Sequence, residues 1–104
     1  MMIWQANDLL TPSDQDAVSL GKAVEERFLT VCELHGKRHG TPIDLPEDLN
    51  NDLILWRTMR VRHKRGDYRN SRSELRATRV VAQWVMDTNC ELRGQEKQTL
   101  KWRD

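Results

Sequence analysis

Residues 70–92, NSRSELRATRVVAQWVMDTNCEL, decide the fold more than any other stretch of the chain. Apolar side chains recur there every three or four residues, the spacing of one helix face. The members of this face are Ala77, Val80, Val81, Trp84, Val85 and Thr88. Candidate N-terminal caps precede it at Asn70, Ser71 and Ser73, and Gly94 follows it as a natural stop. We therefore expect a helix over about 72–92.

Two segments upstream show the same spacing. The first predicts a helix over about 12–35 that begins at Thr11-Pro12 and stops at Gly36; its face is Ala17, Leu20, Val24, Phe28, Val31 and His35. The second predicts a helix over about 46–64 that stops at Gly66; its face is Leu49, Leu53, Trp56 and Met59. No segment alternates polar and apolar residues convincingly, so we expect little strand.

The fold class that follows is mainly α. We predict that residues 1–104 form a single helical domain, a compact three-helix domain with short N- and C-terminal extensions. The predicted core consists of Val24, Phe28, Val31, Leu49, Leu53, Trp56, Val81, Trp84 and Val85. Trp4 and Trp102 are expected to pin the two ends. The tail after Gly94 could form a short helix or strand that packs through Leu100 and Trp102, or it could be loose.

Composition narrows the class of protein. Only 38% of residues are hydrophobic and 32% are charged, which leaves a homodimer possible because burial could be completed by association. Two cysteines do not make a disulfide framework, and the N-terminal residues show no signal-peptide pattern. The longest apolar run in the middle of the chain, residues 53–56, is far shorter than the ~20 residues that span a bilayer. We expect a cytoplasmic protein without membrane contact.

Charge is segregated along the chain. Residues 1–52, the acidic first half, carry four basic residues against ten acids, whereas residues 53–104, the basic second half, carry thirteen against six. Between positions 57 and 79, eight arginines and one lysine face only Asp67 and Glu74. Such a surplus attracts polyanions, and the preference for arginine favours bidentate contacts to phosphate or carboxylate.

The sequence therefore predicts a small, non-catalytic protein that binds nucleic acid or a nucleoprotein through an arginine-rich helical surface. A helix, a turn and a second helix striped with arginine are compatible with helix-turn-helix docking, although the turn is longer than the usual three or four residues. The candidate binding residues are Arg57, Arg60, Lys64, Arg65, Tyr68, Arg69, Arg72, Arg76 and Arg79.

Two other interpretations of the basic region stay open. The arginines could meet an acidic protein surface, in which case the chain is a protein-binding regulator or inhibitor of the small, phage-like kind that docks on a host nucleic-acid-processing complex. They could instead pair with carboxylates of the acidic half and leave little positive potential outside.

No catalytic motif, metal site or cofactor site is predicted. Glycine-rich phosphate loops, nucleophile elbows and paired metal-ligand motifs are absent from the sequence. Cys32, His35 and His39 follow a C-x2-H-x3-H spacing, but a helix ending at Gly36 would separate His39 from the other two. We expect Cys32 and His35 to belong to the core, and we expect that the protein is not an enzyme.

Overall fold

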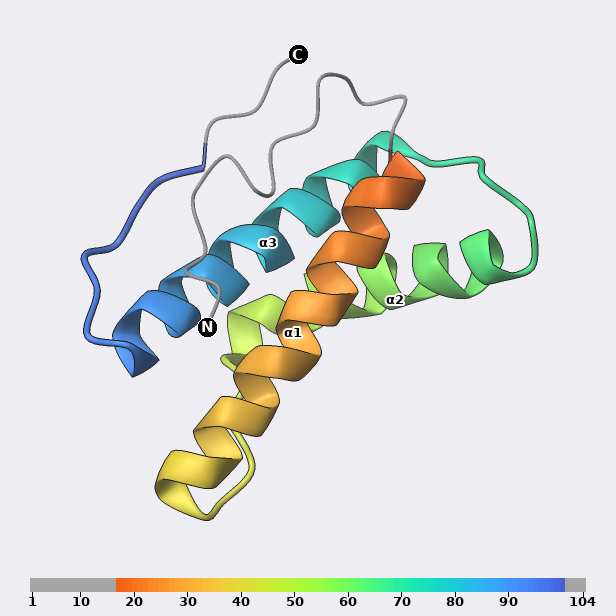
Figure 1. Ribbon diagram of the computed structural model, residues 1–104. Coiled ribbons are helices and arrows are strands. Elements are labelled where there is room, and N and C mark those ends of the chain that lie inside the picture. The colour runs from red at the N-terminus through yellow and green to blue at the C-terminus, as the bar shows by residue number, and fades with distance from the viewer. Residues whose placement is uncertain (1–16, 101–104) are drawn as a thin grey trace.

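The computed structural model describes residues 17–100 (Figure 1). This part of the chain forms helix α1 (Ala17–His39), a short 3₁₀ turn η3 (Glu47–Leu49), helix α2 (Asn50–Lys64) and helix α3 (Arg72–Leu92), and it contains no strand. The predicted mainly α, three-helix fold is confirmed. None of the helices within residues 17–100 has the length and apolarity needed to cross a membrane.

Helix α1 runs beyond its predicted end. Gly36 was expected to stop it, but the helix continues to His39. The amide of Gly40 donates to the carbonyl of Gly36 at 2.8 Å, and Gly40, with φ +67°, adopts the left-handed conformation that ends helices. The prediction failed because two glycines compete for the same role. The predicted start, at Thr11-Pro12, lies outside the described residues.

Helix α2 begins and ends close to the predicted positions. Pro46 precedes the 3₁₀ turn, whose backbone leads directly into α2 at Asn50. At the other end, the amides of Arg65 and Gly66 donate to the carbonyls of Arg62 and His63 at 3.0 Å. Gly66, with φ +87°, then turns the chain toward α3.

Helix α3 is the central element, because it packs against both α1 and α2 (Figure 1). Every predicted core residue is buried except Trp84, which is partly buried and packs on the core with its ring centroid 5.6 Å from that of Phe28. Val80, predicted on the apolar face, is 38% exposed. The buried face of α3 is therefore broader than the sequence predicts and turned away from Val80, because it also includes Thr78, Ala82, Met86, Asn89 and Cys90.

The chain after α3 runs back along that helix to Leu100, which is buried. The side chain of Gln83 holds it: its Oε1 accepts from the Leu100 amide at 2.9 Å and its Nε2 donates to the carbonyl of Gln98 at 2.9 Å. The tail as far as Leu100 therefore packs on the core through this residue, which is one of the alternatives that the sequence left open. Trp4 and Trp102 lie outside the described residues.

Candidate functional site

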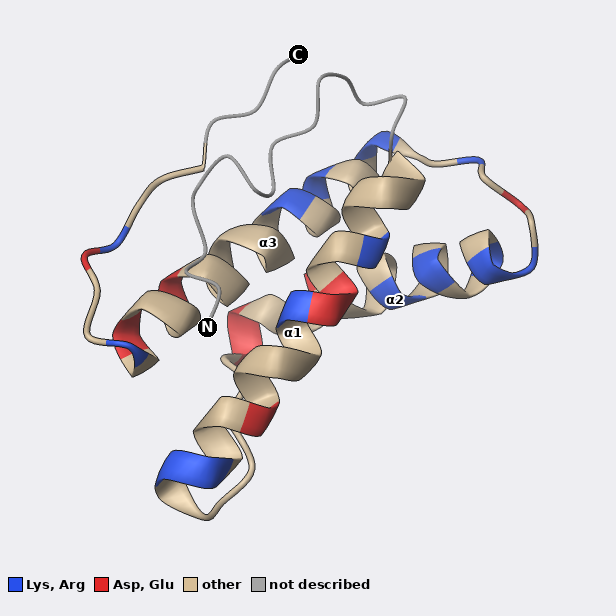
Figure 2. Cartoon of the chain, in the orientation of Figure 1, with Lys and Arg blue, Asp and Glu red and all other residues tan. Residues whose placement is uncertain are grey.

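Basic residues are concentrated in the second half of α2, in the loop that follows it and in the first half of α3 (Figure 2). The nine predicted binding residues all lie in this region, but the structure divides them. One group lines a cleft between α1 and α2, and the other spreads over the α2–α3 loop and the start of α3. The two groups differ in burial and in carboxylate partners.

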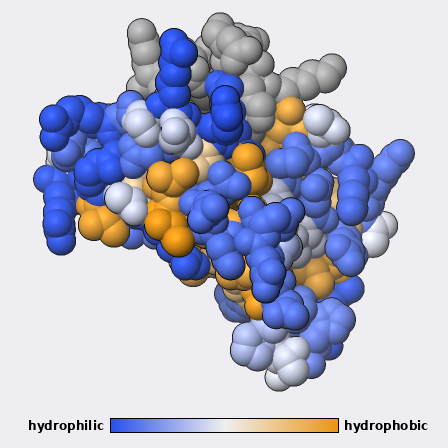
Figure 3. Space-filling model, turned by 180° about the vertical axis from the view of Figure 1, so that it is seen from behind, coloured by the Kyte–Doolittle hydropathy of each residue, from blue (hydrophilic) through white to orange (hydrophobic). Residues whose placement is uncertain are grey.

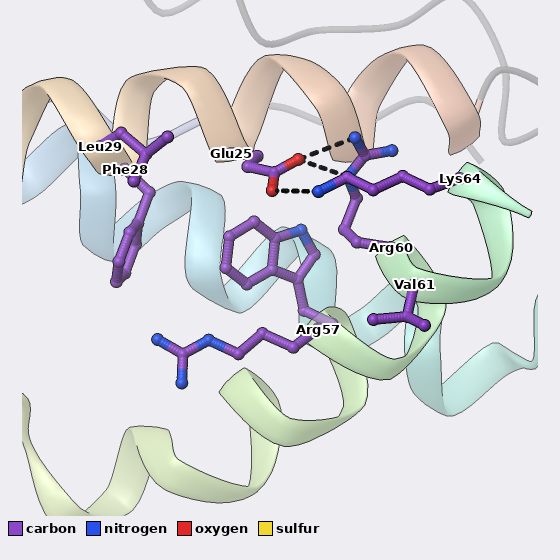
Figure 4. A pocket seen from close by; sticks show the side chains of 8 residues that line it. Glu25, Phe28, Leu29, Arg57, Arg60, Val61 and Lys64 are labelled. Atoms are coloured by element: carbon purple, nitrogen blue, oxygen red, sulfur yellow. Dashed lines mark hydrogen bonds and ion pairs between the residues drawn. The ribbon is translucent and has the colours of Figure 1, made fainter.

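Arg60 and Lys64 are paired with the acidic half of the chain. Glu25 of α1 accepts from Nε and Nη2 of Arg60, at 3.0 and 2.8 Å, and from Nζ of Lys64 at 2.8 Å (Figure 4). Burial raises the pKa of Glu25, but the hydrogen bonds from Lys64 and Arg60 outweigh that effect and leave the pKa below its usual value. Arg60 is only 8% exposed, so it belongs to the helix interface more than to an outer surface.

A second ion pair joins the end of α2 to the first turn of α3. Arg62 donates from Nη1 and Nη2 to the two carboxylate oxygens of Glu74, at 2.6 and 2.7 Å. The same carboxylate accepts from the amide of Ser71, whose hydroxyl accepts from the Glu74 amide in return, so that α3 begins with a capping box. The hydrogen bond from Arg62 is the main reason that the pKa of Glu74 is lowered. One carboxylate therefore caps α3 and ties it to α2.

The loop between α2 and α3 uses most of its polar groups internally. Asp67 accepts from the Arg69 guanidinium at 3.0 Å through each of its oxygens and from the Arg69 amide at 3.2 Å, and these bonds lower the pKa of Asp67 to about 2. Asn70 donates to the carbonyl of Tyr68 and contacts Nε2 of the buried His63 at 2.6 Å. Only some of the polar groups of this loop are therefore available to a ligand.

Three arginines of the second group are exposed, and no carboxylate within residues 17–100 pairs with them: Arg65, Arg72 and Arg76. Arg72 and Arg76 line a shallow depression of about 260 Å³ together with Leu75 and the half-buried Arg79. Tyr68 is 60% exposed. We call this region the arginine surface, defined as Arg65, Tyr68, Arg69, Arg72, Arg76 and Arg79.

The remaining predicted residues, Arg57, Arg60 and Lys64, line a cleft of about 310 Å³ between α1 and α2 (Figure 4). We call it the α1–α2 cleft, lined by Glu25, Phe28, Leu29, Trp56, Arg57, Arg60, Val61 and Lys64. The side chain of Arg57 extends away from Glu25 and its two basic partners, and its guanidinium lies 5.9 Å from the centre of the Phe28 ring. The cleft thus combines apolar walls with a surplus of positive charge.

Several residues that shape these sites were missed in the sequence. Arg62 was missed because its partner, Glu74, lies 12 residues away in the sequence. Glu25 was missed because its partners lie 35 or more residues away. No local sequence pattern reveals contacts at these separations. Leu29 and Val61 did give a signal, since both are apolar residues outside the predicted apolar faces. They are 62% and 49% exposed.

The candidate metal ligands come together on one helix without forming a cluster that could hold an ion. Because α1 extends to His39, it carries Cys32, His35 and His39, and the two imidazole rings lie 4.6 Å apart. Nδ1 of His35 contacts the carbonyl of Thr41 at 3.1 Å. Among residues 17–100, no group of three or more His, Cys, Asp or Glu side chains is placed to bind a metal.

Within residues 17–100, the arginine surface and the α1–α2 cleft are two features that a ligand could use. Comparison of the chain with protein-family models, with curated proteins and with solved structures found no match. A functional assignment therefore depends on the chemistry of these two features.

Proposed function

We propose that this protein is a small, non-catalytic binding protein that contacts nucleic acid or a nucleoprotein through the arginine surface. The observation that carries the proposal is the exposure of Arg65, Arg72 and Arg76 with no carboxylate partner among residues 17–100. Unpaired guanidinium groups on one side of a molecule create a positive potential that attracts phosphate.

The shape of the arginine surface supports phosphate as the ligand group. Arg72 and Arg76, one turn apart on α3, border the same depression, so two guanidinium groups can reach adjacent phosphate oxygens. The exposed ring of Tyr68 offers a face on which a base can stack. These contacts position a backbone and carry no sequence preference by themselves.

Salt dependence of binding tests the proposal. We expect the full chain to bind duplex DNA, single strands or RNA in a fluorescence-anisotropy titration, with an affinity that falls as salt rises. Each lost phosphate contact reduces the log-log salt slope by about 0.9 on duplex DNA, so the double variant R72Q/R76Q should flatten it by about 2.

The matched control removes the same charge elsewhere. Lys22 and Arg38 are exposed residues of α1, and no carboxylate within residues 17–100 pairs with them. The double variant K22Q/R38Q therefore changes net charge equally but leaves the arginine surface intact, and it should keep the wild-type slope. Equal slopes for the two double variants would contradict the proposal.

A protein-binding regulator is the alternative, with the arginine surface or the acidic half placed against a protein. The observation that favours it is the internal pairing of Arg60 and Lys64 with Glu25, and of Arg69 with Asp67, because it leaves fewer cations for a polyanion than the sequence suggests. Failure of DNA, single strands and RNA to bind at low salt would favour this alternative.

A further inference from the structure

We propose that the α1–α2 cleft is a second binding site, which takes a segment of a partner protein bearing a large apolar side chain beside a carboxylate. This site is separate from the arginine surface and does not depend on the function proposed for it. The two sites share no residue.

The walls of the cleft are suited to an apolar side chain. Leu29 on α1 and Val61 on α2 are 62% and 49% exposed, and beneath them lie the buried rings of Phe28 and Trp56. Ile54, two turns before Val61 on the same side of α2, is 61% exposed and extends the apolar surface along the helix. Patches of apolar surface also interrupt the hydrophilic surface on the face seen in Figure 3. Covering such side chains stabilises a complex by removing them from water.

The charge of the cleft selects an acidic neighbour for that side chain. Arg57, Arg60 and Lys64 bring three positive charges, and Glu25 brings one negative charge. Arg60 and Lys64 already share Glu25, whereas Arg57 is exposed and pairs with no carboxylate within residues 17–100. A ligand carboxylate beside the apolar anchor can therefore pair with Arg57 without displacing Glu25.

A polypeptide fits this site better than a nucleic acid. Arg60 and Lys64 are already paired with Glu25, so Arg57 is the one cation of the cleft without a carboxylate partner in the described part of the chain, and a single such cation suits one carboxylate better than a run of phosphates. Leu29 and Val61 offer aliphatic contact, where nucleic-acid sites typically offer stacking rings and several phosphate ligands.

A second copy of the chain fits less well. A symmetric dimer through this cleft would bring Arg57 and Lys64 of both copies together, and like charges at an interface oppose association. The chain does contain an apolar segment rich in acids, residues 43–49. Its Ile43 and Leu45 pack against the protein's own core, so they are not available to another copy in the folded state.

Selection from a library of random peptides on the full-length protein tests the proposal. We expect the selected peptides to place a large apolar residue close to Asp or Glu. The double variant L29Q/V61Q, which changes two exposed side chains, should weaken the best peptide at least about tenfold. Arg57→Gln should weaken it severalfold and reduce the dependence on salt.

Controls separate this site from other surfaces. Val80→Gln changes an exposed apolar residue of α3 outside the cleft, and R72Q/R76Q changes the arginine surface; neither should alter peptide affinity. Trp56 lines the cleft, so its indole N–H resonance should shift when the peptide is added.

Three results would overturn the proposal. One is the absence of any selected peptide, and another is equal binding of the best peptide to L29Q/V61Q and Val80→Gln. The third is concentration-dependent self-association of the wild-type chain that L29Q/V61Q abolishes, because it would assign the cleft to a second copy. Loss of DNA or RNA binding in R72Q/R76Q does not affect the peptide-binding and self-association results. The proposals for the two sites can therefore be refuted independently.

Discussion

At Gly21, side chains of α2 lie directly against the backbone of α1, and adding a methyl group there should destabilise the protein relative to the same change elsewhere on α1. A Cβ at position 21 would lie 2.9 Å from Cδ of Arg60 and 3.2 Å from Cε of Met59. Overpacking of this kind costs about 1–3 kcal/mol, and the gain in helix propensity from Gly to Ala returns about 0.5–1 kcal/mol. Because Arg60 is held by Glu25, its stem cannot move without straining that ion pair.

Gly36 is the matched control, since it lies within the same helix and a Cβ there meets nothing within 4 Å. Gly36→Ala should raise the free energy of unfolding by about 0.5–1 kcal/mol. We therefore expect Gly21→Ala to be less stable than Gly36→Ala by about 1–3 kcal/mol in urea unfolding followed by circular dichroism. Equal stabilisation by the two substitutions would refute the close approach of α1 and α2 at this position.

Three further predictions concern the cap, the ion pair and the thiols. Ser71→Ala should lower the free energy of unfolding by about 1 kcal/mol because it removes the cap of α3, whereas Ser73→Ala in the first turn should change it little; urea unfolding measures both. Because the pKa of Glu74 is lowered in the folded state, its contribution to stability is present above its ordinary pKa of 4.5 and is lost as pH falls through the folded value. Glu74→Gln should therefore flatten the acid limb of a stability–pH curve, and an unchanged limb would contradict the pairing. Burial raises the pKa of both thiols, so iodoacetamide should modify Cys32 slowly at neutral pH and Cys90, which is 2% exposed, only on unfolding. Mass spectrometry showing equal rates for the two cysteines in the native protein would refute this order.

The helices were predictable because each carries its own periodic apolar face, which is a local property of the sequence. Val24, Leu53 and Val81 are buried as their spacing predicts. The end of α1 was predicted wrongly because both Gly36 and Gly40 are acceptable stops, and hydrogen bonding beyond the first of them decides between the two.

The sites were predictable only in part, for a different reason. Sequence shows where arginines accumulate, but whether each one is paired depends on contacts between distant segments. Arg60 meets Glu25 from 35 positions away, whereas Arg72 and Arg76 meet no carboxylate in the described part of the chain. The α1–α2 cleft depends on how two helices pack against each other. The periodicity of one segment predicts a helix but not its position relative to another helix.

The ion pair of Arg62 and Glu74 has a consequence for the binding proposed for the arginine surface. Since it joins the end of α2 to the first turn of α3, and Arg62 also donates to the carbonyl of Arg69, the loop that carries Arg65 and Arg69 is braced at both ends. The backbone that carries Arg65 and Arg69 is therefore held in place relative to α3, and association loses little backbone entropy there. A ligand that fits this backbone arrangement is favoured over one that would need the loop to adapt.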